Sequence, residues 1–271
     1  MAKLAYLGPP GTFGEEAALR FAPGAELVAF PSHSAVIGAV ASGACDRGVA
    51  AIENSLEGSV PETLDSLIGE KTVSLCAETA LPIRHYLLGR EDTRSAGVEV
   101  IFSHPQALGQ CRRFIQKHYP DAQVEAALST AFAVKEMLEQ PGAAAIGTER
   151  AALLYGASIL ARDIQDDNSN TTRFVLVAAR DADPTGDDKT SLAFSTRDES
   201  GALVRALEEF ATRGINLTKI ESRPAKERLG VYVFLVDVEG HRTDPPVAEA
   251  LEHLKRDTVE LRVFGSYPRY R

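Results

Sequence analysis

Four polar residues, Asn170 to Arg173, precede the apolar segment 174–177 and are the first sign of chemistry in this sequence. An amide, two hydroxyls and a guanidinium at the start of a strand are poor core material, because buried polar groups need partners. The same groups can hold a small anion and donate a hydrogen bond to a departing oxygen atom. The run therefore indicates a binding site for a small anionic ligand.

Three other polar clusters stand between a predicted strand and a predicted helix. Residues 53–59 include Asn54, residues 8–14 place Thr12 among glycines, and residues 103–106 read Ser-His-Pro-Gln. Ligands of open α/β folds bind at the carboxyl ends of strands, and the first N–H groups of a helix favour anions. Each cluster also has a structural alternative, namely a helix cap, a tight turn or a lone structural histidine.

Amides and hydroxyls recur in two helical patterns further along the chain. Gln110 lies four residues after Gln106, so the two amides share one face of a helix predicted at residues 106–118. Ser129 and Thr130 open another predicted helix, where a plain N-cap is the simpler explanation. Together these positions add uncharged donors to the expected site.

Motifs for covalent or metal-dependent catalysis are missing. The sequence contains no catalytic-triad signature, no His-Glu-x-x-His motif and no evident pair of carboxylates, so neither a metal nor a covalent intermediate is expected. Neutral donors, helix N-termini and one cation, Arg173, remain. These groups suit a small polyanion whose charge moves during a reaction.

Composition narrows the class of protein. The 271 residues have a net charge of −9, which disfavours nucleic acid and acidic membrane surfaces as partners. The length suits two domains, or one domain with two lobes. The three cysteines are too scattered for a disulfide framework. The N-terminus lacks a signal-peptide pattern and no run approaches the ~20 apolar residues of a membrane span, so we expect a cytoplasmic location.

Residues 1–180 alternate strands with helices, which predicts an α/β fold with largely parallel sheets. Two longer extended segments, 72–88 and 164–179, are expected to cross between two lobes and to bring Thr172 near a cleft. A single continuous sheet with long edge strands is the alternative. Strands are predicted at residues 4–7, 26–30, 48–52, 98–102, 123–126 and 143–146, and helices at 15–21, 34–42, 60–68, 106–118, 131–139 and 149–155.

The pattern changes after a polar segment at residues 180–189, which contains Pro184 and Gly186 and is typical of a linker. The following elements have the order βαββαβ, the ferredoxin-like arrangement. We therefore expect domains at 1–180 and 189–271, joined by a linker at 181–188. In the domain at 189–271, strands are predicted at 190–195, 215–221, 229–238 and 259–264, and helices at 201–213 and 247–254.

Six motifs resemble those of the prephenate dehydratase family and cover nearly the whole chain in order. Residues 8–13, 53–59, 103–108 and 170–174 are similar to its catalytic part, and residues 201–204 and 221–224 are similar to its ACT regulatory domain. The resemblance implies a two-lobed α/β catalytic domain like type II solute-binding proteins, followed by a ferredoxin-like ACT domain. No room is left for a leading chorismate mutase segment, so a monofunctional form is expected.

The resemblance also implies a reaction and its control. Family members convert prephenate to phenylpyruvate, with loss of CO2 and water, on the route to phenylalanine. No cofactor is needed, because formation of the aromatic ring drives the elimination. L-phenylalanine is the implied allosteric inhibitor, bound between paired ACT domains of a homodimer or homotetramer.

Residue roles follow from the matched motifs. Thr172 would assist the leaving hydroxyl, Asn54, Ser103 and Gln110 would orient the substrate, and Arg173 would face a carboxylate or brace the site. For Arg173 a structural salt bridge is the alternative, and for the ACT part a plain dimerisation module. The implied substrate contacts are Thr12, Ser55, Gln106, Ser129, Thr130 and Thr171. The implied effector contacts are Gly201, Ala202, Leu203, Asn216, Leu217, Glu221, Ser222, Arg223 and Pro224.

Two other functions remain open at this point. One is a non-catalytic binder, a solute-binding fold joined to an amino-acid sensor. The other is dehydration of arogenate, which carries an amine where prephenate has a ketone. The sequence departs from the family pattern at Gly14, where Ser or Thr is common, and at Ala51, where Pro is common.

Overall fold

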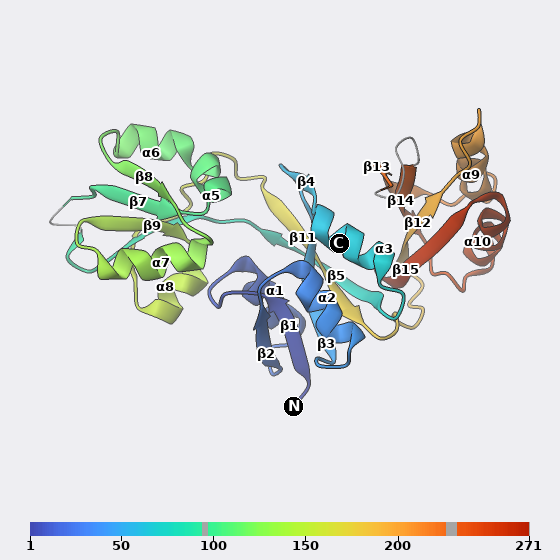
Figure 1. The fold of residues 1–271 in the computed structure, drawn as a ribbon, viewed down its shortest axis with the longest axis horizontal. Coiled ribbons are helices and arrows are strands. Elements are labelled where there is room, and N and C mark those ends of the chain that lie inside the picture. The colour runs from blue at the N-terminus through green and yellow to red at the C-terminus, as the bar shows by residue number, and fades with distance from the viewer. Residues whose placement is uncertain (94–96, 226–231, 271) are drawn as a thin grey trace.

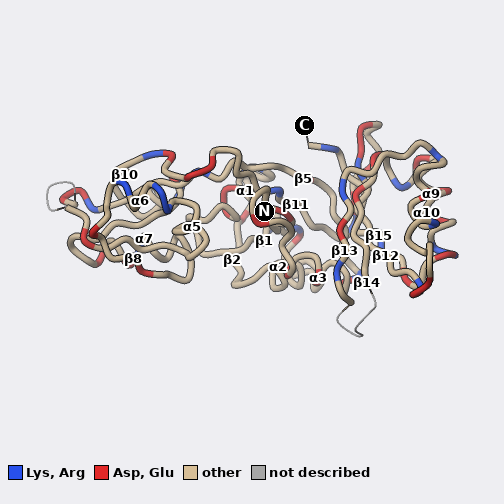
Figure 2. Tube along the Cα trace, turned by 90° about the horizontal axis from the view of Figure 1, so that it is seen from above, with Lys and Arg blue, Asp and Glu red and all other residues tan. Residues whose placement is uncertain are grey.

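The computed structural model of the chain describes residues 1–93, 97–225 and 232–270. Its described residues form three bodies in a row, each built on its own β-sheet (Figures 1 and 2). A lobe that contains the N-terminal strand lies in the middle, a second lobe lies at one end, and the C-terminal domain lies at the other. No helix in the described part of the chain combines the length and the apolar composition needed to cross a membrane.

The middle lobe is formed by the first third of the chain together with one strand that returns from the second lobe. Its strands are β1 (Lys3–Leu7), β2 (Glu26–Phe30), β3 (Arg47–Asn54), β4 (Gly58–Ser59), β5 (Ser74–Pro82) and β11 (Thr171–Ala178), and its helices are α1 (Phe13–Phe21), α2 (His33–Ala41) and α3 (Pro61–Gly69). The sheet order is β2-β1-β3-β11-β5, with β4 paired to β3. β11 thus lies between β3 and β5, antiparallel to both.

The second lobe is formed by the middle of the chain. Its strands are β6 (Tyr86–Gly89), β7 (Val100–Ser103), β8 (Gln123–Ala126), β9 (Ala143–Gly147) and β10 (Ser158–Ala161), and its helices are α5 (Pro105–Gln110), α6 (Arg112–His118), α7 (Thr130–Glu139) and α8 (Glu149–Tyr155). The sheet order is β10-β6-β9-β7-β8. The helix predicted at residues 106–118 is divided at Cys111, whose backbone leaves the helical region at φ −116° and ψ 17°.

The chain crosses between the lobes twice, as predicted, once between β5 and β6 and once between β10 and β11. The two sheets are separate, so the alternative of one continuous sheet does not hold. The prediction of largely parallel sheets is only partly correct. β1, β2 and β3 are parallel, as are β7, β8 and β9, but β6, β10 and β11 run antiparallel to their neighbours. β11 and β6, one beside each crossing, therefore run against the strands on both sides of them.

The C-terminal domain has the predicted ferredoxin-like order of elements. They are β12 (Asp188–Ser195), α9 (Ala202–Ala211), β13 (Leu217–Pro224), β14 (Tyr232–Glu239), α10 (Pro245–Asp257) and β15 (Glu260–Pro268). The sheet order is β13-β14-β12-β15. The start of the strand predicted at residues 229–238 lies outside the described residues.

This domain packs directly on the middle lobe and shares a hydrophobic core with it. Leu75 and Val175 of the middle lobe belong to one buried cluster with Leu235 and Tyr267 of the C-terminal domain. At Gly265 the two backbones approach so closely that a Cβ atom would overlap the backbone of Leu75. β15 is therefore held against β5.

Candidate active site

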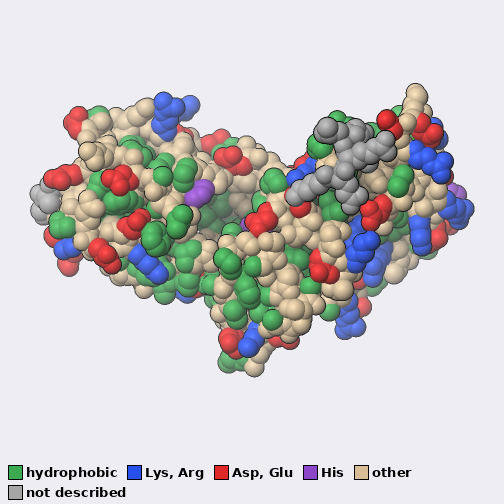
Figure 3. All heavy atoms as spheres, viewed as in Figure 1, with side chains coloured by type: hydrophobic (Ala, Val, Ile, Leu, Met, Phe, Trp, Pro, Cys, Tyr) green, Lys and Arg blue, Asp and Glu red, His purple; other side chains and the backbone are tan. Residues whose placement is uncertain are grey.

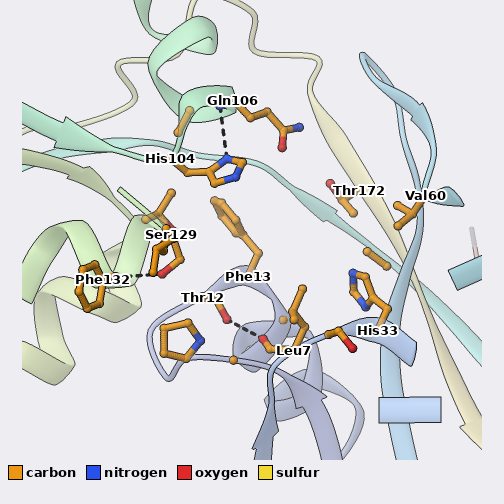
Figure 4. Close-up of a pocket in the computed structure, with 18 of the residues that line it drawn as sticks. Leu7, Thr12, Phe13, His33, Val60, His104, Gln106, Ser129, Phe132 and Thr172 are labelled. Carbon is orange, nitrogen blue, oxygen red and sulfur yellow. Dashed lines mark hydrogen bonds between the residues drawn. The ribbon is translucent and has the colours of Figure 1, made fainter. Parts of the chain in front are cut away.

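A cleft of about 970 Å3 opens between the two lobes (Figure 3). Figure 4 shows Phe13 between its two sides, with Ser129 on one side and Thr172 and His33 on the other. Among the described residues, the starts of α1, α2, α3, α5 and α7 all reach the wall of the cleft. The residues at these helix starts are Thr12, Phe13 and Gly14, Ser32 and His33, Val60 and Glu62, His104 and Gln106, and Ser129 and Thr130.

The cleft can hold an anion although no Lys or Arg is among its described lining residues. The first N–H groups of a helix carry positive partial charge and point out of its N-terminus. At α1 the Thr12 hydroxyl donates to the Leu7 carbonyl at 3.1 Å and does not cap the helix. At α7 Ser129 Oγ accepts from Phe132 N at 3.0 Å, which satisfies only one of the N–H groups there. Helix starts and neutral donors are therefore the groups of the described lining that can attract an anion, and they stand beside one carboxylate, Glu62.

Thr172 and Asn54 form the polar centre of the cleft. They are register partners on β11 and β3, and each is 8% exposed. Asn54 Nδ2 donates to Thr172 Oγ1 at 2.8 Å. Asn54 Oδ1 accepts from the backbone N–H groups of Leu56 and Glu57 at 3.0 and 3.1 Å, which fixes the orientation of the amide. Thr172 is thus the acceptor in this pair and keeps its own proton for a ligand.

A chain of amides extends from this pair across the connection between the lobes. Asn54 Nδ2 also donates to Asn170 Oδ1 at 2.8 Å, and Asn170 Nδ2 donates to Gln110 Oε1 at 2.9 Å. The same Gln110 oxygen lies 2.9 Å from His85 Nε2. We refer to Asn54, Asn170 and Gln110 as the amide relay. It connects Thr172 to α5 of the second lobe through uncharged groups.

Arg173 follows Thr172 but lies on the opposite face of the sheet, outside the cleft lining. Its guanidinium is 3.1 Å from Glu53, 3.1 Å from Glu78 and 2.9 Å from Asp237 of β14. Burial disfavours the charged form, but these carboxylates, Asp237 foremost, raise the pKa of Arg173 above its ordinary value. The geometry is that of an ion-pair cluster at the domain interface, so the cation expected near the ligand points away from it.

Two buried histidines that the sequence reasoning did not select also line the cleft. His33 is 7% exposed and His85 is 3% exposed, and the Nδ1 atom of each has no hydrogen-bond partner among the described residues. Burial lowers the pKa of both imidazoles, so both are neutral near pH 7. Figure 4 shows the His33 ring directed toward the side of the cleft where Thr172 lies. The position of His85 in a predicted crossing segment was the signal that could have identified it.

Besides Arg173, three predicted site residues, Ser103, Ser55 and Thr171, do not line the cleft. Ser103 is fully buried and donates its hydroxyl to the Ile146 carbonyl at 2.7 Å. Ser55 Oγ accepts from Thr171 N at 3.0 Å and so ties the loop after β3 to β11. Phe174, expected only to begin a buried strand, does line the cleft. The predicted residues in the lining are Thr172, Asn54, Gln110, Thr12, Gln106, Ser129 and Thr130.

The predicted effector residues lie on α9, on β13 and beside them. Glu221 accepts a hydrogen bond from the Ser59 hydroxyl and lies 3.6 Å from Lys219, and Arg223 is 3.2 Å from Asp65. Ser59 and Asp65 belong to the middle lobe, so this motif contacts the lobe that carries Asn54 and Thr172. The other predicted residues are Gly201 at the cap of α9, Ala202 and Leu203 on α9, Asn216 and Leu217 at the start of β13, and Ser222 and Pro224 on β13.

The two lobes, the cleft between them and the ferredoxin-like domain define a protein of the periplasmic-binding-protein type with an added C-terminal domain. Comparison with family models gives a narrower assignment. Residues 4–182 match the model described as prephenate dehydratase, and residues 190–256 match the model described as ACT domain. The chain therefore belongs to the prephenate dehydratase family, which comprises decarboxylating hydro-lyases.

Proteins named as prephenate dehydratases match this chain over almost its full length. A bifunctional chorismate mutase/prephenate dehydratase of Aquifex aeolicus is 46% identical over 98% of this chain and 74% of its own length. A prephenate dehydratase of Mycolicibacterium vanbaalenii is 41% identical over 99% of this chain and 91% of its own. The structure of prephenate dehydratase from Arthrobacter aurescens in complex with L-Phe is 36% identical, with a TM-score of 0.91, and the match covers 99% of this chain and 90% of that one.

Proposed function

We propose that the protein converts prephenate to phenylpyruvate for L-phenylalanine biosynthesis and that L-phenylalanine inhibits it through the ACT domain. Family membership carries the dehydratase activity. The observation that supports the site is the hydrogen bond from Asn54 to Thr172, which leaves a hydroxyl proton free in a buried cleft. Prephenate is a dianion, which suits a cleft surrounded by helix starts.

The proposed reaction balances with one proton from solvent. The ring carboxylate leaves as CO2, and the electron pair of the broken C–C bond enters the ring. The hydroxyl on the opposite ring carbon leaves with its bonding pair and becomes water on taking up a proton. The products are phenylpyruvate, CO2 and water. The protein must therefore stabilise negative charge on the departing oxygen while the carboxylate loses its negative charge as CO2.

Thr172 donates to the departing oxygen in this proposal. As the proton is shared, negative charge builds on Thr172 Oγ1, where the N–H donor of Asn54 stabilises it. A threonine hydroxyl is a very weak acid, so we assign it a strong hydrogen bond at the transition state and not a complete proton transfer. The buried position of both groups strengthens this bond, because water does not compete for it.

Other residues hold the substrate or the framework. Four groups of the lining contact the carboxylates and the ring, namely Thr12, Gln106, Ser129 and Thr130, and Gln110 orients the substrate from the second lobe. Ser55 and Thr171 keep the loop beside Asn54 in place, and Ser103 ties β7 to β9 in the second lobe. Arg173 braces β11 from the opposite face.

Regulation is proposed to act through the face that joins the two domains. L-phenylalanine binds between paired ACT domains of a homodimer or homotetramer, and its ammonium group takes the place of the Ser59 hydroxyl at Glu221. In support, a relative has been solved in complex with L-Phe, and Glu221 contacts the middle lobe directly. We assign residues 1–180 to the catalytic domain, 181–188 to the linker and 189–271 to the ACT domain.

The test is to mix the purified protein with prephenate and to measure phenylpyruvate while L-phenylalanine is titrated, with D-phenylalanine as the control. We expect product, and inhibition by the L-isomer alone. Product without an L-phenylalanine response would contradict only the regulation. Binding of prephenate in a calorimeter without any product would instead favour the non-catalytic binder. A higher kcat/KM for arogenate than for prephenate would show that arogenate is the preferred substrate.

A further inference from the structure

His85 ends the amide relay, and its hydrogen bond there has a defined direction. Gln110 Oε1 accepts from Asn170 Nδ2 at 2.9 Å and lies 2.9 Å from His85 Nε2. An amide oxygen cannot donate, so the proton in the second contact belongs to His85 Nε2. In the neutral ring Nδ1 then carries a lone pair, and no described residue donates to it. His85 is therefore an Nε2–H donor held next to the cleft.

The orientation of Gln110 follows from this donor. Backbone N–H groups fix the orientation of the Asn54 amide. Because Asn54 donates to the Asn170 oxygen, the Asn170 nitrogen is the group that donates to Gln110. Two donors, Asn170 Nδ2 and His85 Nε2, thus hold the Gln110 oxygen. The Gln110 amide nitrogen makes no hydrogen bond to any described residue, and Gln110 lines the cleft. The amide nitrogen is thus the part of the Gln110 side chain that is left for a ligand.

We propose that His85 is a positioning residue for the dehydration, because its Nε2–H keeps the Gln110 amide nitrogen directed at the substrate. The inference rests on the proposed roles of Thr172 and Gln110. Without His85 the Gln110 oxygen has one donor fewer and is free to turn into the cleft, where it would repel a carboxylate. With His85 in place, Thr172 from the middle lobe and Gln110 from the second lobe both act as donors. An anionic substrate requires donors of this kind.

Two substitutions separate the donor from the bulk of the ring. In His85→Gln the side-chain amide nitrogen reaches the position of Nε2 and retains the donor to Gln110. In His85→Asn the amide is shorter, reaches only the position of Nδ1 and loses that donor. We expect His85→Asn to raise the KM for prephenate about tenfold, the worth of one hydrogen bond, and His85→Gln to stay near wild type. Equal loss in both variants would overturn the proposal.

A double substitution tests whether His85 acts through Gln110. In a Gln110→Ala background, His85→Asn should have no further effect on KM, because the group that it positions is already absent. Multiplicative losses in the double variant would show that His85 acts independently. Urea unfolding of each variant identifies any change in KM that comes from a loss of fold.

A measurement independent of turnover tests the tautomer. Nitrogen-15 spectra of histidine-labelled protein, with His85→Gln used for assignment, should show an imidazole protonated at Nε2 and bare at Nδ1 at pH 7. Protonation of His85 at Nδ1 alone would overturn the proposal while leaving the dehydratase activity untouched. Failure of wild-type protein to form phenylpyruvate would instead overturn the proposed function, so the two failures are distinguishable.

Discussion

The two faces of the β3–β11 strand pair carry opposite kinds of polar chemistry. On the cleft face Asn54 and Thr172 meet through uncharged groups. On the other face their sequence neighbours, Glu53 and Arg173, meet as ions in contact with the C-terminal domain. Side chains alternate along a strand, so a single step in sequence leads from the centre of the cleft to the domain interface.

The difference follows from what each face must do. In the proposed function, dipoles in the cleft attract the charges of the substrate, and no ion pair has to be broken first. Ions at the interface are already paired with each other: Arg173 contacts three carboxylates, and Lys189 lies 2.9 Å from Glu78. Such a cluster holds the backbone of β11 in place from behind, while Thr172 projects from its front.

Loss of Arg173 should have the largest effect, and on stability. Arg173→Leu leaves Asp237, whose side chain is 8% exposed, without its Arg173 counter-ion, and it leaves Glu78, whose side chain is 2% exposed, with Lys189 alone. Breaking a buried ion cluster by removal of one partner costs about 3–5 kcal/mol, which urea unfolding would detect. Arg173→Lys, which keeps the charge, should lose less. A loss below ~1 kcal/mol, as for exposed pairs, would remove the contrast between the faces.

Loss of the Thr172 hydroxyl should affect turnover and not stability. Thr172→Ala is expected to lower kcat by about 10²–10³, because one oriented donor to developing charge is removed. Its free energy of unfolding should change far less than that of Arg173→Leu. Thr172→Ser keeps the hydroxyl and is the matched control, with kcat closer to wild type. If Thr172→Ala retained wild-type kcat, the cleft face would have no chemical role.

The fold could be predicted where one periodicity dominates a segment. The strands expected at residues 26–30 and 123–126 coincide with β2 and β8, and both crossings were recognised from long extended runs. The break at Cys111 was missed, because the apolar spacing continues through it on one helix face. β10 was missed too. It is a short edge strand whose residues are all half-buried, so it shows no alternation.

The site was predictable only as far as local motifs carry the information. Thr172 and Asn54 stand in runs of polar residues beside strands and were both selected. The direction of Arg173 depends on Asp237, which lies 64 positions away in another domain, so no local pattern contains it. His85 was missed for a similar reason, since its partner Gln110 is 25 residues away. Ser103 was selected from its position after a strand, but its side chain turns inward to Ile146.

Acid should act on the cleft face through its two buried histidines. The pKa values of His33 and His85 lie below the ordinary value of 6.5, so the unfolded chain takes up protons first as the pH falls. Stability is therefore fully present above about pH 6.5 and declines below it until each folded-state pKa is reached. Each histidine adds up to ~1.4 kcal/mol per pH unit to that slope. Urea unfolding between pH 7 and pH 5 measures it.

Single substitutions assign this slope to residues. His85→Gln should flatten the slope, because it removes one of the two imidazoles whose pKa is lowered by burial. A slope identical in the wild type and in His85→Gln would show that His85 does not resist protonation in the folded state. That result would leave the cleft face without the neutral imidazole on which its donor pattern depends.

The smallest effect is expected at the edge of the ionic face and concerns regulation. Lys219 Nζ lies 2.7 Å from Ser59 Oγ and 3.3 Å from Glu53, and so links the effector motif to the strand that carries Asn54. Lys219→Met should raise the L-phenylalanine concentration needed for half-inhibition about fivefold, a coupling of ordinary size, while kcat without effector stays nearly constant. Steady-state inhibition curves measure both quantities.

Lys71→Met is the matched control for this prediction. Lys71 also joins the middle lobe to the C-terminal domain, through Glu260 at 3.3 Å, but both side chains are exposed and remote from the Glu53–Arg173 pair. Exposed pairs contribute little, so inhibition by L-phenylalanine should not change. Equal shifts in the two variants would mean that domain contact in general transmits the effector signal. A shift in Lys219→Met alone would mean that the effector signal passes through Glu53, the sequence neighbour of Asn54.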